Sequence, residues 1–198
     1  MTNPPPENAH PLSGWLQGQR GSTMIEVLVT LIIVAFGILG LGGLHLRMQL
    51  SDMESYQRAQ ALVLLDDIAN RMAANRAQAN TYVTGASTPL GSGMSCPTTP
   101  ATLTQTDTEQ WCNALQGAAE QLGGSKTGAM IGARGCIENL GTNAYIITVA
   151  WQGMTPTVAP PPSVGCGAGL YASPNSSGCT GDLCRRTVTT VLNIATLN

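Results

Sequence analysis

Charged and aromatic residues are scarce in this chain of 198 residues, at 10% and 4%. The nine Lys and Arg residues are scattered and the formal net charge is −2, so the basic face that nucleic-acid binding needs is missing. A content of 43% hydrophobic residues also excludes disorder along the whole chain. We expect no nucleic-acid partner and, after residue 80, a globular part that is rich in loops and turns.

Histidine is nearly absent, since only His10 and His45 occur. Neither is placed to serve as general base for a Ser or Cys nucleophile. The glycines of "GARGCIENLGTN" lack the spacing of a phosphate-binding loop. Asp66 and Asp67 are adjacent on a predicted helix, so their carboxylates point apart. We expect no catalytic residues, no cofactor and no metal ion, and therefore not an enzyme.

Cysteine is missing before residue 96 and then occurs six times. The count is even, the spacings are wide and there is no CxxC pair, which disfavours a zinc site. Disulfides formed in an oxidising compartment are the better interpretation; free buried thiols in a cytosolic protein are the alternative. Six cysteines allow 15 pairings, and we expect Cys184 to pair with Cys166 or Cys179. The candidates are Cys96, Cys112, Cys136, Cys166, Cys179 and Cys184.

One long apolar run is present, from Val27 to Leu44, and Thr30 is its only polar side chain. As a helix it spans about 27 Å at 1.5 Å per residue, close to the roughly 30 Å of a bilayer core. No small-residue cleavage site follows the run, so we expect it to remain in the mature protein. Glu26 stands directly before the run, where a carboxylate is costly without a counter-charge.

The helical pattern continues beyond the run. Apolar residues recur every three or four positions as far as Met72, and Glu54–Arg58 and Asp67–Arg71 are spaced for ion pairs on a solvated face. No proline interrupts residues 22–80, so we expect one helix of about 55 to 60 residues that ends before Gly85. The four central glycines favour either close helix packing or local melting of the helix; the alternative is that transmembrane helices simply tolerate glycine. These are Gly37, Gly40, Gly42 and Gly43.

The remaining sequence predicts an α+β domain. A short helix is expected within residues 102–124, ended by Gly123 and Gly124. Strands are expected within residues 128–139, 143–153 and 185–197. In the second strand Tyr145, Ile147, Val149 and Trp151 share one face, as in a half-buried strand; in the third, Val188, Thr190, Leu192 and Ile194 do. An antiparallel sheet packed on the long helix, with disulfide-stapled loops, is the expected fold.

The N-terminal residues resemble the type IV pilin family. Arg20 and Gly21 precede Ser22, Thr23 and Glu26, and the apolar run follows at once. The resemblance implies that a prepilin peptidase and methyltransferase cuts between Gly21 and Ser22 and methylates the new amine of Ser22. It also divides the chain into four parts: a leader (1–21), a transmembrane and assembly half of the helix (22–45), a periplasmic amphipathic half (46–84) and a globular α+β domain (85–198).

The resemblance gives Glu26 a physical role. After cleavage, the ammonium of Ser22 and the carboxylate of Glu26 are complementary charges at one membrane depth, and they can pair between neighbouring subunits. Breaking a buried pair costs about 3–5 kcal/mol, because one charge stays unpaired, and this fixes the register of assembly. In the alternative, Glu26 is only an acid favoured by the helix dipole, worth about 0.3–1 kcal/mol.

Longer stretches resemble minor pilins in particular: residues 26–44, 56–79 and 145–153. Gly43 stands where many major pilins have proline. The resemblance implies a subunit that primes pilus assembly in the inner membrane and is then carried to or near the tip of an extracellular pilus, with roles in motility and adhesion. Implied partners are other minor pilins, the major pilin, the inner-membrane assembly platform and a tip adhesin. A minor pseudopilin of a type II secretion system is the alternative, and a membrane-anchored adhesin is a third.

Overall fold

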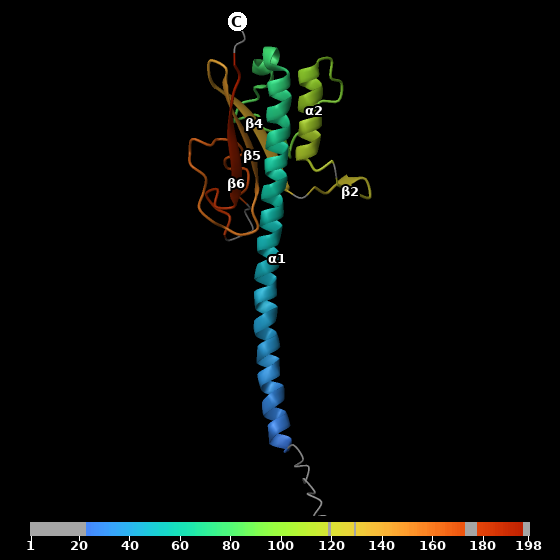
Figure 1. The fold of residues 1–198 in the computed structure, drawn as a ribbon, viewed down its shortest axis with the longest axis vertical. Coiled ribbons are helices and arrows are strands. Elements are labelled where there is room, and N and C mark those ends of the chain that lie inside the picture. The colour runs from blue at the N-terminus through green and yellow to red at the C-terminus, as the bar shows by residue number, and fades with distance from the viewer. Residues whose placement is uncertain (1–22, 119, 129, 173–177, 196–198) are drawn as a thin grey trace, which may run out of the picture. The chain divides into compact units, whose positions relative to one another are not determined.

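The computed structural model describes residues 23–118, 120–128, 130–172 and 178–195 (Figure 1). Gly21, Ser22 and the leader lie outside the described residues. The chain divides into two compact units, with the boundary between Leu46 and Arg47. The elements are α1 (Met24–Ala74), the 3-10 helix η1 (Arg76–Tyr82), β1 (Leu90–Gly91), α2 (Leu103–Leu115), β2 (Gln121–Leu122), β3 (Ser125–Lys126), β4 (Ile131–Gly141), β5 (Ala144–Gln152) and β6 (Arg185–Asn193).

The long helix is confirmed as α1, of 51 residues, but it ends at Ala74, earlier than expected. Asn75 leaves the helical conformation (φ −101°, ψ 44°). Its side-chain amide donates instead to the Tyr82 hydroxyl, at 3.1 Å, and to Thr104 Oγ1, at 3.3 Å. Tertiary hydrogen bonds therefore stop α1 where the sequence pattern alone would let it continue, and the chain turns into η1.

In the second unit, four antiparallel strands form one sheet in the order β1-β4-β5-β6. The expected face of β5 is confirmed, since Tyr145, Ile147, Val149 and Trp151 are at most 4% exposed. They share a core with residues of the C-terminal part of α1, among them Ala61, Leu65, Ile68 and Met72. The fold is α+β and pilin-like, with a helix packed on an antiparallel sheet.

The opposite face of the sheet is also covered, which the alternating pattern of β5 does not reveal. Thr148 and Ala150, of the other parity, are 1% and 0% exposed. A second buried cluster joins Ala150 with Cys136, Cys166 and Tyr171. The loop between β5 and β6 therefore packs on this face, and the sheet is buried on both sides at this point.

The short helix is confirmed as α2 but is shorter than expected. Thr102 caps it, with its side chain accepting from Gln105 N at 3.3 Å. It ends at Leu115, because Gly117 takes φ +80° and lies so close to Gly128 that a Cβ there would be 2.2 Å from the backbone N of Gly128. Gly123 and Gly124 do not end α2 and instead form the turn between β2 and β3, so that part of the prediction was wrong.

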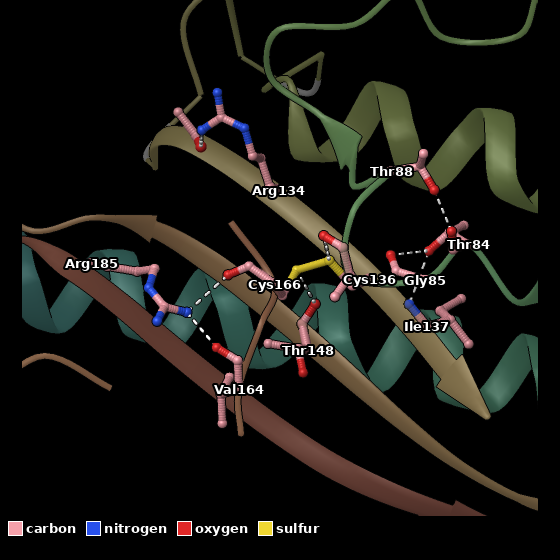
Figure 2. Close-up of a disulfide and its surroundings, with 12 residues drawn as sticks. Thr84, Gly85, Thr88, Arg134, Cys136, Ile137, Thr148, Val164, Cys166 and Arg185 are labelled. Atoms are coloured by element: carbon pink, nitrogen blue, oxygen red, sulfur yellow. Dashed lines mark hydrogen bonds between the residues drawn. A yellow bond between two sulfur atoms is a disulfide. The ribbon is translucent and has the colours of Figure 1, made fainter. Parts of the chain in front are cut away.

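Three disulfides staple the second unit: Cys96–Cys112, Cys136–Cys166 and Cys179–Cys184. Of the two partners expected for Cys184, the structure has Cys179. Figure 2 shows Cys136 of β4 bonded to Cys166 of the β5–β6 loop. Beside it, the buried Arg185 donates through Nη1 to the carbonyls of Val164, at 2.7 Å, and Cys166, at 3.1 Å. The loop is thus fixed to the sheet by a covalent bond and by a buried guanidinium.

Loop length ranks the disulfides by their expected effect on stability. Cys136 and Cys166 are 30 residues apart, whereas Cys179 and Cys184 are 5 apart. In the chain-entropy model, the double variant Cys136→Ser/Cys166→Ser, which removes the bond that closes the longer loop, should lower the free energy of unfolding by about 3–4 kcal/mol. Urea unfolding of the full chain in detergent measures this cost, with Cys179→Ser/Cys184→Ser as the control of smaller effect. Equal losses in both variants, or peptide mapping that finds other pairs, would contradict the assignment.

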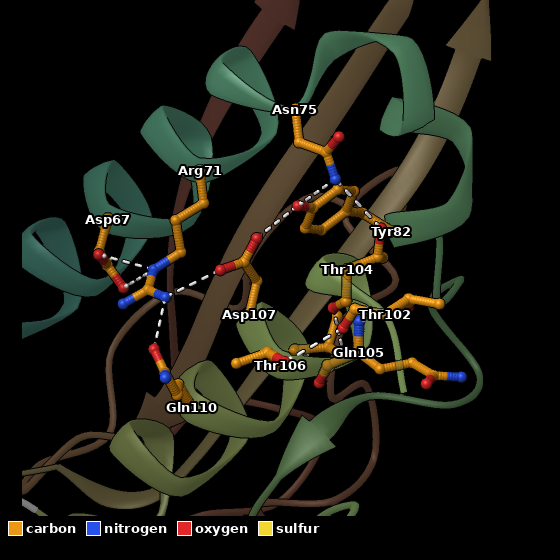
Figure 3. Close-up of polar contacts among 11 residues, drawn as sticks. Asp67, Arg71, Asn75, Tyr82, Thr102, Thr104, Gln105, Thr106, Asp107 and Gln110 are labelled. Carbon is orange, nitrogen blue, oxygen red and sulfur yellow. Dashed lines mark hydrogen bonds and ion pairs between the residues drawn. The ribbon is translucent and has the colours of Figure 1, made fainter. Parts of the chain in front are cut away.

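A polar network joins the end of α1 to α2 (Figure 3). Arg71 Nε lies 3.0 Å from Asp67 Oδ1, which confirms that predicted pair, and Arg71 Nη1 lies 3.0 Å from Asp107 Oδ1. Tyr82 donates to the other oxygen of Asp107. Burial alone would lower the pKa of Arg71, but hydrogen bonds to Asp67 and Asp107 raise it above its usual value. For Tyr82, burial and then the hydrogen bond to Asp107 raise the pKa of the hydroxyl.

The raised pKa of Tyr82 predicts a loss of stability at alkaline pH. The folded protein holds this proton more tightly than the unfolded chain does. The contribution is therefore complete below about pH 10, the ordinary tyrosine pKa, and is lost as the pH rises through the higher folded value. Between pH 8 and about 11.5, the melting temperature of the full chain should fall more steeply with pH for the wild type than for Tyr82→Phe. If the melting temperatures of both proteins fall in parallel, Tyr82 does not titrate in this range.

Gln57 of α1 is a buried polar residue that is expected to destabilise the packing of the helix. Its side chain is 0% exposed, and neither its amide nitrogen nor its carbonyl oxygen has a hydrogen-bond partner among the described residues. A buried polar group without a partner costs about 1–3 kcal/mol. Gln57→Met keeps the length of the side chain and should raise the free energy of unfolding by that amount. Gln60→Met, at a half-buried position of the same helix, is the control expected to change little.

Candidate functional site

The N-terminal part of α1 carries the residues on which the predicted processing and assembly depend. The carbonyl of Thr23 accepts hydrogen bonds from the backbone N–H groups of Glu26, at 2.9 Å, and Val27, at 3.3 Å. Glu26 therefore lies in the first turn of α1, where its negative charge is favoured by the helix dipole. Its side chain is exposed. The predicted cleavage residues, Gly21 and Ser22, fall outside the described residues.

The apolar run forms an exposed helical surface. From Val27 to Leu44 the large hydrophobic side chains are between 47% and 72% exposed. Thr30, the one polar side chain, donates to the carbonyl of Val27 at 2.8 Å, so the helix satisfies its hydroxyl internally. By length and composition, α1 is the one helix among the described residues that could cross a membrane, and its most apolar segment is not buried by the chain itself. Such a surface requires apolar surroundings, which a bilayer or a bundle of neighbouring helices supplies.

The central glycines lie on the same exposed segment. A Cβ placed on any of them would meet no other atom of the described chain within 4 Å, apart from the helix's own backbone nearby. Close packing inside this chain is therefore not what keeps them small. Their φ values are those of the regular α1 helix, so the predicted local melting is absent from the subunit as described here. The four residues are Gly37, Gly40, Gly42 and Gly43.

The predicted ion pair between Glu54 and Arg58 is wrong. Glu54 Oε1 instead lies 3.2 Å from Arg186 Nη2 at the start of β6. The same oxygen accepts from the backbone N–H groups of Met154, at 3.1 Å, and Thr155, at 3.3 Å. Partners about a hundred positions away outcompete the neighbour one helical turn along. Helix spacing could not reveal this contact, because it depends on where β6 begins.

The described residues hold no cluster that could bind a metal ion and no free thiol. No three His, Cys, Asp or Glu side chains in the ranges described come together in a way that could hold a metal ion. All six cysteines are disulfide-bonded, so none is a nucleophile or a thiolate ligand. The chain's chemically distinctive part is thus its N-terminal segment.

Comparison with known families agrees with that conclusion. Residues 16–42 match the family model described as the prokaryotic N-terminal methylation motif. The match includes Gly21, Ser22 and Glu26 together with most of the apolar run, and it leaves the second unit uncovered. No curated protein and no solved structure matches the chain. The matched motif implies processing by a prepilin peptidase, and the apolar helix fits a membrane-anchored protein. The N-terminal segment thus carries a prepilin-type methylation motif, which supports a type IV pilin-like protein.

Proposed function

We propose that this protein is a minor type IV pilin of the PilV type, which helps to prime pilus assembly in the inner membrane and then lies at or near the pilus tip. The single observation that carries the proposal is the methylation motif, with Gly21, Ser22 and Glu26 directly before an exposed apolar helix. A retained helix of this kind serves as membrane anchor before assembly and as packing surface afterwards. The protein acts by assembly and not by catalysis.

The minor rather than the major role is supported by sequence likeness. The stretches "EVLVTLIIVAFGILGLGGL", "YQRAQALVLLDDIANRMAANRAQA" and "YIITVAWQG" are similar to PilV-type proteins. Gly43 replaces the proline that many major pilins have in the middle of this helix. The proposed partners are other minor pilins, the major pilin, the assembly platform and a tip adhesin.

In the proposed sequence of events, the globular unit reaches the periplasm while the leader stays in the cytoplasm. The peptidase cuts after Gly21 and methylates Ser22. Glu26 then pairs with the N-terminal ammonium of an adjacent subunit in a surrounding of low dielectric constant, and the exposed apolar side chains pack against neighbouring helices. The disulfides suit a unit that must stay folded outside the cell.

A deletion strain tests this proposal. Loss of the gene should reduce sheared surface pili and twitching motility while release of exoproteins stays normal, and the wild-type gene on a plasmid should restore both. The reverse pattern, with normal pili and blocked exoprotein release, would assign the chain to a type II secretion system as a minor pseudopilin. Normal pili together with normal secretion would reject both assignments.

A further inference from the structure

We propose that the open edge of β6 binds an extended, acidic segment of another subunit, whose carboxylate pairs with Arg58. The proposal joins two features of the second unit: a long strand edge that pairs with no other described strand, and beside it an arginine that forms no ion pair with a described residue. It deepens the proposed function and rests on it, because the partner is taken to be another subunit of the assembly.

The edge of β6 is regular, and no strand of the described part of the chain pairs with it. β6 is the last strand of the sheet, and its register with β5 runs from Asn193 to Arg185 without a shift. Ile194 N bonds to Asn143 O, and Cys184 O accepts from Gly153 N. Even-numbered residues therefore face β5, and the backbone groups of the odd-numbered ones face outward. Thr187, Thr189, Val191 and Asn193 are the outward-facing residues.

Natural sheets usually protect such an edge with charged side chains, proline, a bulge or a covering segment. None of the first three occurs between Thr187 and Asn193, and Thr189, Val191 and Asn193 are exposed. The strand is also rich in β-branched residues, which favour a further strand. Backbone pairing with an extended peptide is the recognition mode that this edge fits.

A hollow of about 240 Å³ opens between α1 and the start of β6. Its wall includes Ser55 and Arg58 of α1, Trp151 of β5 and Arg186 of β6. Arg186 is neutralised by Glu54, but Arg58 has no ion pair with any described residue. The hollow therefore has a surplus of one positive charge and is suited to a carboxylate.

The two features lie together. Arg186 and Val188 line the hollow from the helix-facing side of β6, and no strand lies beyond them. A strand added to this edge would run about 4.8 Å from β6. Its helix-facing side chains, opposite Arg186 and Val188, would lie over the hollow. An Asp or Glu at that register would meet Arg58.

The carboxylate does not come from the same strand of a second copy. β6 itself carries two arginines and no Asp or Glu, so pairing with the same strand of a second copy would bring like charges together. The parts of the second unit outside the described residues are Ala119, Ala129, residues 173–177 and residues 196–198, and none of them is acidic. Charge complementarity thus favours an acidic segment of another subunit over β6 of a second copy and over the undescribed parts of the second unit.

Photo-crosslinking in the living cell tests the inference. The full chain carries benzoylphenylalanine at Thr189, or at the exposed Leu103 of α2 as the position control, and adducts are identified by mass spectrometry. We expect a strong adduct at Thr189 with a peptide that contains Asp or Glu. Arg58→Glu should reduce it by about tenfold or more, equivalent to about 1.4 kcal/mol, whereas Arg58→Lys should reduce it less. Arg76→Glu, at another exposed arginine, should leave it unchanged.

A second variant addresses the backbone pairing. With the crosslinker moved to Val191, Thr189→Pro removes one outward N–H and should abolish the adduct, while Thr189→Val should keep it. Adducts that survive both Thr189→Pro and Arg58→Glu, or that equal those at Leu103, would overturn the inference. If deletion of the gene abolishes pili but Arg58→Glu gives normal pili and normal adducts, only this inference fails. If deletion leaves pili intact, the proposed function fails instead.

Discussion

Replacing Gly21 with leucine is expected to leave the protein uncleaved and absent from pili. By its resemblance to prepilins, the chain must enter the peptidase cleft extended, with a minimal side chain just before the cut. Gly21 lies within the matched methylation motif, whereas Gly14 lies before it. Gly14→Leu is therefore the matched control and should be processed normally. The uncut chain should still insert in the membrane, because the apolar helix is unchanged.

Two measurements check this expectation. Immunoblots of membranes should show the Gly21→Leu protein at the mass of the precursor, and sheared pili should lack it. N-terminal sequencing of the wild type and of the Gly14→Leu control should begin at Ser22. A Gly21→Leu chain that starts at Ser22 in sheared pili would show that the cleavage site is elsewhere.

Strong local patterns made the long elements predictable. α1 could be predicted from the apolar run that ends at Leu44 and from the apolar residues that recur every three or four positions after it, because helix formation depends on neighbouring residues. The alternation from Tyr145 to Trp151 defines β5, because one face of that strand meets the core. The N-terminal motif could also be identified from the sequence, since its residues lie within a few positions of one another.

Element ends and long-range polar contacts were not predictable in the same way. α1 stops at Ala74 because Asn75 bonds to Tyr82 and Thr104, and none of these partners is fixed by helix propensity. α2 stops early because Gly117 meets Gly128, a contact that exists only in the folded unit. Glu54 pairs with Arg186 and not with Arg58, and this contact also exists only in the folded unit. Each of these failures comes from a tertiary contact that the local sequence pattern does not encode.

The disulfides lie between these two extremes. Their existence followed from an even count and from the absence of metal-ligand spacing, whereas the pairing depends on which loops the sheet brings together. Cys136 meets Cys166 because the β5–β6 loop folds back over the sheet, where its own Tyr171 packs with Ala150 of β5. The alternation in β5 gave no sign that its second face would be covered.

The last expected result concerns Glu26, and it separates cleavage from assembly. In the proposed mechanism, cleavage depends on the bond between Gly21 and Ser22, whereas Glu26 acts later, when an incoming helix pairs its charges. Glu26→Ala should therefore be cut and inserted normally, yet should co-purify poorly with partner pilins and prime few pili. The ammonium left unpaired costs about 3–5 kcal/mol if the pair is fully buried, and less if water or lipid headgroups reach it.

Glu26→Gln retains the shape and one hydrogen-bonding oxygen, so its defect should be milder than that of Glu26→Ala. Asp52→Ala, at an exposed carboxylate further along α1, is the matched control and should leave pilus yield unchanged. N-terminal sequencing of the membrane-extracted variants and the yield of sheared pili measure the two steps separately. Normal pilus numbers with the Ala variant incorporated would contradict the charge-register mechanism. Glu26 would then be a helix-end acid, whose dipole interaction of about 0.3–1 kcal/mol is too weak to control assembly.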